Sequence, residues 1–275
     1  MSVSIITACK NRVKALSVSI SSWIQFNEVD EIIVTDWNSD EPIDHLTQLD
    51  SRIKVIRVLN EKYFNQPQPL NLAASIATSE CLLKLDCDHI LNPYFNFFEL
   101  HKLEKDSFVS GCNSSNWKMD AYFLYPLWGL LYVKNEVFKK VGGYNENMGK
   151  YYAVEDDELS LRLISYGLTP IPIDITKFSA LHIAHNNKDR VKNFESFENI
   201  CKILSEKNLP EDKLYGCITE LSVNKNHNNY PMTSKVLDMF KENSNKELDI
   251  SFYSAPIYNW KITKVNDQIY QAIKI

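Results

Sequence analysis

Short runs of β-branched and aliphatic residues alternate with segments of helical periodicity over the first 88 residues, and this alternation limits the possible folds more than any other feature. The first run, Val3–Thr7, ends in the polar loop 8–12, and apolar residues then recur at helical spacing from Val13 to Ile24. The same pattern predicts strands at Glu31–Thr35, Ile53–Leu59 and Cys81–Leu85, and a helix at Pro69–Thr78. We therefore expect an α/β fold with a Rossmann-like, mostly parallel central sheet flanked by helices, and ligands at the carboxyl ends of its strands.

The alternation weakens after Asp88. The pattern predicts a helix at Tyr94–Glu104, an extended segment at Phe108–Cys112, and a helix at Asp156–Tyr166 that Gly167 would cap. Weaker strand candidates lie near Asp249–Tyr253 and Ile257–Ile262. We expect a main domain over residues 1–215 and a small C-terminal appendage, residues 216–275, packed on it.

Composition excludes several classes of protein. The net charge of the 275-residue chain is −5 and neither sign forms long runs, which argues against a nucleic-acid-binding face. Six cysteines without CxxC spacing predict reduced thiols, mostly in the core, and neither a zinc site nor a disulfide framework. The longest uncharged segment, Ala121–Val133, is shorter than the roughly 20 residues that span a bilayer. We expect a soluble, cytoplasmic protein.

Acidic residues follow two of the predicted strands. Asp86 and Asp88 stand one residue apart after the run 82–85, and Asp36 follows Thr35. Carboxylates this close repel each other unless a cation neutralises them, and Mg²⁺ and Mn²⁺ prefer such oxygen ligands. The alternative for this pair is a solvated loop after a strand. Asp36 is either a turn former or a carboxylate that accepts a nucleobase N–H, with donors for phosphate and ribose in the neighbouring loop 8–12.

A second group of candidates lies between residues 142 and 185. Four acids, Glu155–Glu158, stand together at a predicted helix N-terminus after three nearby glycines. First-turn acids explain one or two of them through the helix dipole, whereas a carboxylate kept ionised there could act as a general base. His182 and His185 are either packed, hydrogen-bonded residues or ligands of a Mn²⁺-type site that Asp88 begins.

Over about residues 3 to 190 these motifs, in this order, resemble the GT-A nucleotide-sugar glycosyltransferases. The resemblance is carried by "TACKNR", "VTDWNSD", "NLAASIATSECLLKLDCD", and "GGYNE" followed by "EDDELSLRL". The later motifs are similar to those of galactosyltransferase-type domains and bacterial chondroitin-polymerase-type modules. The resemblance implies a nucleotide-binding part at about 1–110 and an acceptor-binding part at about 111–200.

The resemblance also implies a role for each candidate residue. Nucleotide contacts are implied for Thr7, Ala8, Lys10, Arg12, Asp36, Lys84 and Asp86. Asp88 would bind the metal directly, with His185 or, in its place, His182 as a later ligand, and Asp156 would be the catalytic base. Acceptor binding is implied for Tyr152, Glu155 and Asp157, although Lys150–Val154 replaces the Trp- and Gly-rich loop of relatives, which leaves the acceptor open.

We predict a metal-dependent inverting hexosyltransferase that uses Mn²⁺ or Mg²⁺ and moves a hexose or N-acetylhexosamine from a UDP-sugar to a glycan. Surface polysaccharide synthesis is the expected setting, and a lipid-linked acceptor would bring the enzyme to the inner face of the membrane. Three alternatives remain: a sugar-nucleotide pyrophosphorylase, a catalytically silent sugar- or nucleotide-binding module, and a metal hydrolase. The first should open with a Gly-rich phosphate loop, and "TACKNRVKAL" contains no glycine.

Overall fold

Nine strands form one mixed sheet in the computed structural model, which describes residues 1–62, 64–111, 129–146, 155–173, 177–180 and 260–275. In sheet order they are β10 (Trp260–Lys264), β11 (Ile269–Lys274), β3 (Ile53–Val58), β2 (Val29–Trp37), β1 (Val3–Cys9), β4 (Cys81–Lys84), β7 (Leu131–Lys134), β6 (Ser107–Ser110) and β8 (Thr169–Pro172). A separate pair joins β5 (His89–Ile90) to β9 (Ser179–Ala180). The helices are α1 (Val13–Trp23), η1 (Asp44–Gln48), α2 (Pro67–Ile76), α3 (Phe97–Leu100), α4 (Asn135–Lys140) and α5 (Glu155–Ser165).

Strands β11, β3, β2, β1 and β4 are parallel neighbours, while β7 is antiparallel to both β4 and β6. The mostly parallel Rossmann-like sheet is thereby confirmed. Because parallel strands end at the same edge, the loops after β1, β2 and β4 meet there. This edge carries Asp36, Asp86 and the loop that begins at Lys10.

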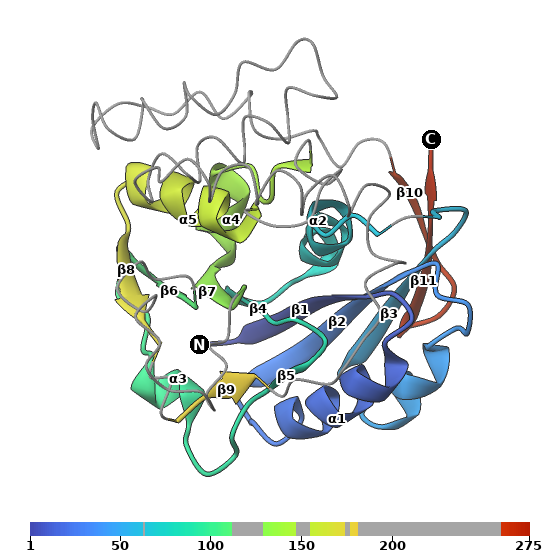
Figure 1. The fold of residues 1–275 in the computed structure, drawn as a ribbon, viewed down its shortest axis with the longest axis horizontal. Helices are drawn as coiled ribbons and strands as arrows, with labels where there is room; N and C mark the ends of the chain where they lie inside the picture. Colours follow the sequence, from blue (N-terminus) through green and yellow to red (C-terminus); the bar gives the residue numbers. More distant parts are fainter. Residues whose placement is uncertain (63, 112–128, 147–154, 174–176, 181–259) are drawn as a thin grey trace, which may run out of the picture.

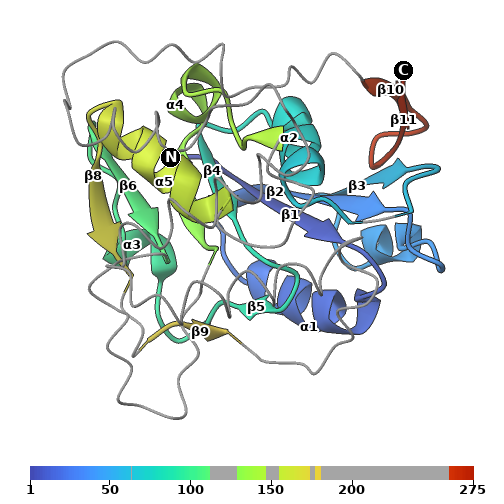
Figure 2. The same ribbon diagram turned by 45° about the horizontal axis from the view of Figure 1, so that its top comes forward.

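Helices cover both faces of the sheet (Figures 1 and 2). One hydrophobic cluster lies with α1 and η1, and a second lies with α2, α4 and α5. Successive strand residues point to opposite faces, so Ile5 and Ile32 enter the first cluster while Ile6 and Ile33 enter the second. Burial on both faces explains why these strands read as continuous apolar runs in the sequence.

One predicted helix is much shorter than expected. In place of Tyr94–Glu104, α3 spans only Phe97–Leu100. The Asn96 side chain accepts hydrogen bonds from the N–H groups of Phe98 and Glu99, so it caps the helix at that point. The helical periodicity upstream of Asn96 belongs instead to a turn around Pro93, in which the Asn92 side chain accepts from the N–H of Tyr94. At the other predicted helix end, Gly167 has φ +104° and follows α5, which confirms its capping role.

The last residues of the chain extend the main sheet. The described part of the strand predicted near 257–262 belongs to β10, and β11 pairs in parallel with β3, so residues 260–275 extend the main sheet. The Gln268 side chain donates to the carbonyl of Ile53 at 2.9 Å. Residues 216–259, and with them the strand candidate at 249–253, lie outside the described residues, and the 1–215 boundary stays a prediction. Among the helices that the structure describes, none has the length and apolar character needed to cross a bilayer.

Candidate active site

The turn after β4 holds the two acids of the DxD motif, Asp86 and Asp88. Pairing of β4 with β1 continues one residue further, since the N–H of Leu85 donates to Ile6 at 3.1 Å, and the chain then turns. His89 closes that turn: its N–H donates to the Asp86 carbonyl, and its Nδ1 accepts the Asp86 N–H at 3.1 Å. Ligand atoms of Asp86, Asp88 and His89 lie within 4.8 Å of one another.

Of these three residues, His89 is the least suitable metal ligand, because its contacts select a tautomer with no free ring nitrogen to bind a metal. Burial lowers the pKa of His89, so the ring is neutral at pH 7. Because Nδ1 accepts a backbone N–H, the ring proton resides on Nε2, which lies 3.8 Å from Asp86 Oδ2. The carboxylates of Asp86 and Asp88 keep their partial exposure and offer the oxygen ligands that a hard divalent cation prefers, so the donor set fits Mg²⁺ or Mn²⁺.

Two cations flank these acids. Arg12 Nη1 lies 3.7 Å from Asp88 Oδ2, and Lys84 Nζ lies 3.0 Å from Asp86 Oδ1. The other amino group of Arg12, Nη2, is buried and has no hydrogen-bond partner among the described residues. Gln66, which precedes α2, donates to Asp86 Oδ1 at 3.2 Å. The acidic edge therefore lies beside groups that can also contact an anion.

Asp156, at the start of α5, is brought to the same place. Lys84 Nζ donates to Asp156 Oδ1 at 3.1 Å and to Oδ2 at 3.2 Å, and the Tyr144 hydroxyl donates to Oδ1 at 2.8 Å. Burial disfavours the Lys84 ammonium, but the charges of Asp156 and Asp86 outweigh it and raise its pKa. Gly129, with φ +82°, lies against these groups; a Cβ there would be 2.5 Å from Lys84 Nζ. Residues separated by more than 70 positions thus form one charged cluster.

The adjacent acids Glu155 and Asp156 have different environments. Burial, reinforced by the neighbouring Asp156, raises the pKa of Glu155 to about 8, so Glu155 holds its proton at neutral pH. Burial also raises the pKa of Asp156, while Lys84 and the Tyr144 hydroxyl act against it. A carboxylate with compensated charge and a raised pKa suits proton acceptance near neutral pH better than an ordinary surface acid does. Of the pair, Asp156 has the environment of a general base.

Asp36 is fully buried at the end of β2. Its Oδ1 accepts the N–H of Ser39 at 3.1 Å, and its Oδ2 is ion-paired with Arg57. These contacts fit the alternative in which Asp36 forms the turn, and they do not test a contact with a nucleobase. Arg57 also donates to the Ser39 carbonyl at 2.7 Å, so it joins the polar groups at this edge.

The remaining nucleotide candidates lie on β1 and in the loop after it. Thr7 is fully buried and its hydroxyl lacks a hydrogen-bond partner within the part of the chain described; Ala8 is partly buried. Lys10 Nζ donates to the carbonyls of Trp37 and Asn38 at 3.0 and 3.1 Å, and so ties the loops after β1 and β2 together. Tyr152, His182 and His185 lie outside the described residues, as does the side chain of Asp157.

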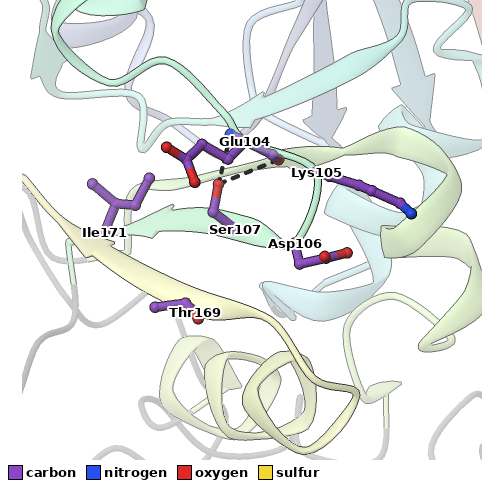
Figure 3. Close-up of a pocket in the computed structure, with 6 residues that line it drawn as sticks. All are labelled: Glu104, Lys105, Asp106, Ser107, Thr169 and Ile171. Atoms are coloured by element: carbon purple, nitrogen blue, oxygen red, sulfur yellow. Dashed lines mark hydrogen bonds between the residues drawn. The ribbon is translucent and has the colours of Figure 1, made fainter.

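A separate hollow lies at the opposite edge of the sheet (Figure 3). Its volume is about 390 Å³, and it is lined by Glu104, Lys105, Asp106, Ser107, Thr169 and Ile171. Ser107 and Thr169 begin β6 and β8, which run parallel to β4, so this hollow is at the amino edge and away from Asp86. The Ser107 hydroxyl is already used by the backbone of Glu104. We do not place the active site there.

Several residues at the site were not anticipated from the sequence. They are Gln66, Asn71, His89, Gly129 and Tyr144. Tyr144 lies within the "GGYNE" motif, but its spacing alone does not say that its hydroxyl reaches Asp156. Asn71 has the periodicity of an ordinary helical position, and only the packing of α2 shows that it touches the motif.

A sheet of this topology, with acids gathered after its central strands, has the GT-A fold, and its family match makes the chain a nucleotide-sugar glycosyltransferase. The chain belongs to glycosyl transferase family 2, whose sequence profile matches residues 4–148. No curated protein shows a significant match to the chain.

Solved structures that share the fold include two glycosyltransferases. The 1–349 fragment of S. aureus TarS in complex with UDP-GlcNAc superposes with a TM-score of 0.53 at 16% identity, covering 83% of this chain and 73% of that one. The mannosyltransferase PcManGT from Pyrobaculum calidifontis, in complex with GDP-Man and Mn²⁺, gives a TM-score of 0.53 at 11% identity, with 90% and 77% covered. At these identities the likeness concerns the fold.

Proposed function

We propose that this glycosyltransferase is metal-dependent and inverting, and that it transfers a hexose or N-acetylhexosamine from a UDP-sugar to a glycan hydroxyl in surface polysaccharide synthesis. One observation carries the proposal: Lys84 Nζ lies 3.0 Å from Asp86 Oδ1 and 3.1 Å from Asp156 Oδ1. The acid of the DxD motif and the candidate base therefore lie on either side of one ammonium group. A single displacement needs the base of the acceptor close to the groups that hold the donor, and this proximity supports the proposal.

On the donor side, Asp88 would hold Mn²⁺ or Mg²⁺ directly, and Asp86 would contact the ribose or a water bound to the metal. When bound, such an ion neutralises the negative charge that develops on the leaving diphosphate. His185, or in its place His182, is proposed as a further ligand. The pairing of β9 with β5 supports this, because Ala180 lies opposite His89 and both histidines follow Ala180 closely in the sequence.

Thr7, Ala8, Lys10, Arg12 and Asp36 are proposed to line the nucleotide. Support comes from their common position at the carboxyl edge, from the unpaired Thr7 hydroxyl and Arg12 Nη2 within the described part of the chain, and from Arg57 beside Asp36. The contacts of Lys84 favour a different role from nucleotide binding, as it is fully buried between two carboxylates.

On the acceptor side, Asp156 is proposed to take the proton of the attacking hydroxyl while that oxygen displaces the diphosphate at the anomeric carbon. A single displacement inverts the anomeric configuration and needs a base but no covalent intermediate. Tyr152, Glu155 and Asp157 are proposed to position the acceptor. Because the Glu155 side chain is buried, it would support the residues that bind the sugar and would not contact the sugar itself.

The test is UDP release from a panel of UDP-sugars, with Mn²⁺, with Mg²⁺ and with chelator, and with or without glycan acceptors. We expect release that requires the metal and increases with an acceptor. UDP-sugar binding without release would identify a silent binding module, and release indifferent to every acceptor would identify a hydrolase.

Asp156→Asn provides the sharper test of the base. Loss of a positioned general base should reduce the transfer rate by about 10²- to 10⁴-fold with UDP-sugar affinity retained. Asp267→Asn, which alters an exposed acid on the C-terminal hairpin, is the matched control and should behave as the parent protein does. Full transfer by Asp156→Asn would refute the assignment.

A further inference from the structure

The phenol of Tyr144 is buried against the candidate base. Tyr144 is fully buried, and its hydroxyl donates to Asp156 Oδ1 at 2.8 Å. Burial raises the pKa of Tyr144, so the hydroxyl keeps its proton and acts as a donor. The contact joins the "GGYNE" segment to the first turn of α5.

The backbone of Tyr144 is fixed by a side chain from a different element. Asn71 of α2 accepts the Tyr144 N–H on Oδ1 at 2.9 Å and donates from Nδ2 to the Tyr144 carbonyl at 2.8 Å. Gly143 permits this approach, because a Cβ at that position would lie 2.6 Å from Asn71 Oδ1 and its φ is +65°. Arg162 of α5 donates to the Gly143 carbonyl at 2.7 Å. Tyr144 is therefore held from two helices.

These contacts leave the two oxygens of Asp156 unequal. Oδ1 accepts from both Tyr144 and Lys84, whereas Oδ2 accepts from Lys84 at 3.2 Å. Gly129 packs closely against Oδ2, since a Cβ there would lie 2.8 Å from that atom, and the Asp156 side chain stays 19% exposed. We infer that Tyr144 is a positioning residue that holds Oδ1 and presents Oδ2 to the acceptor hydroxyl, and that Asn71 sets the position of Tyr144. This inference rests on the proposed role of Asp156.

In the transfer step, Oδ2 takes the proton as the acceptor oxygen bonds to the anomeric carbon and the bond from that carbon to the diphosphate breaks. Tyr144 neither gains nor loses a proton. Its contribution is the orientation of the carboxylate, together with a hydrogen bond that favours the ionised form before transfer. Lys84, Asp86 and Glu155 also interact with the carboxylate, and Tyr144→Phe alters none of these residues.

The test compares Tyr144→Phe with Tyr132→Phe in the otherwise unchanged 275-residue chain. Each substitution removes one hydroxyl from a buried tyrosine, but the Tyr132 hydroxyl contacts Met1 Sδ at 3.7 Å, away from Asp156. Tyr144→Phe should lower kcat by about 10- to 100-fold, the effect of losing one hydrogen bond to a charged group, and leave the KM for UDP-sugar unchanged. Its acid limb in the kcat–pH profile should move to higher pH, since the lost hydrogen bond had lowered the pKa of Asp156. Tyr132→Phe should change neither.

The Asp156→Asn background separates this inference from the proposed function. If Tyr144 acts through Asp156, adding Tyr144→Phe to Asp156→Asn should cause no further loss of kcat. A further 10- to 100-fold loss in that background would overturn the inference, as would an unchanged kcat and pH profile in Tyr144→Phe alone. Full activity of Asp156→Asn would instead overturn the proposed base. Values of kcat are referred to the fraction of protein that binds UDP, so partial unfolding of a variant does not imitate the effect.

Discussion

At the scale of single residues, the site depends on a buried cation. Lys84 is 1% exposed and lies between Asp86 and Asp156, and its positive charge opposes the rise that burial causes in the pKa of Asp156. An apolar side chain in place of Lys84 would leave Asp86 and Asp156 without this ion-pair partner. Removing it leaves two partly buried carboxylates uncompensated.

Lys84→Met keeps the length of the side chain and removes the charge. We expect the free energy of unfolding at pH 7 to fall by about 3 kcal/mol, because breaking a buried ion pair leaves a buried charge without a partner. Urea denaturation measures this directly. Lys264→Met is the control, since its partner Asp267 is 97% exposed at the side chain and such surface pairs contribute little. Equal stability of the two variants would show that Lys84 is not needed to hold the acids.

At the scale of elements, one side chain of β2 connects three neighbouring segments. Glu31 accepts from the Ser4 hydroxyl of β1 at 2.5 Å and from the Thr78 N–H before β4 at 2.6 Å, and it is ion-paired with Lys54 of β3. Burial opposes ionisation of Glu31, but the hydrogen bonds from Lys54, Ser4 and Thr78 outweigh it and lower its pKa below the ordinary 4.5.

This linkage predicts an acid-dependent loss of stability. A lowered carboxyl pKa contributes stability that is complete above the unfolded value of 4.5 and disappears as the pH falls through the lower folded value. Glu31→Gln should therefore cost about 1–2 kcal/mol at pH 7, and its difference from the parent protein should vanish below that lower value. Urea titrations at several pH values measure it. A difference that stays constant from pH 7 down to pH 3 would contradict the role of the charge.

Elements and contacts differ in how far the sequence predicts them. Strands β1 to β4 and helices α1, α2 and α5 follow from local apolar periodicity, and Asp86 and Asp36 follow from their positions at strand ends. The contact of Tyr144 with Asp156 does not, because it depends on how Asn71 of α2 and Arg162 of α5 hold the segment 143–144, and spacing does not predict this. The role of Asn71 is not predictable from the sequence either. Its sequence neighbours indicate only a helix, and it holds Tyr144, which is 73 residues away.

At the scale of the whole molecule, the two ends of the described chain meet in one sheet. β11 pairs with β3 some 200 residues earlier, a contact that no local pattern in either segment predicts. Trp260 of β10 packs against Trp37 with ring centroids 5.4 Å apart, and Trp37 directly follows Asp36. The C-terminal hairpin lies beside β3 (Figure 1), and through Trp260 it supports the end of β2, where the proposed nucleotide site begins.

Trp260→Ala should show this long-range support. Trp260 is 7% exposed, and loss of a buried tryptophan costs about 3 kcal/mol or more, so we expect a lower free energy of unfolding. The cavity beside Trp37 should also loosen the turn at Asp36 and weaken UDP binding several-fold, as measured by calorimetry on the fully folded variant. Ile273→Ala, on the same hairpin but 45% exposed, should change stability by no more than about 0.5 kcal/mol and leave UDP affinity unaltered. If Trp260→Ala loses stability while its UDP affinity stays at the parent value, the hairpin supports the sheet but not the nucleotide edge.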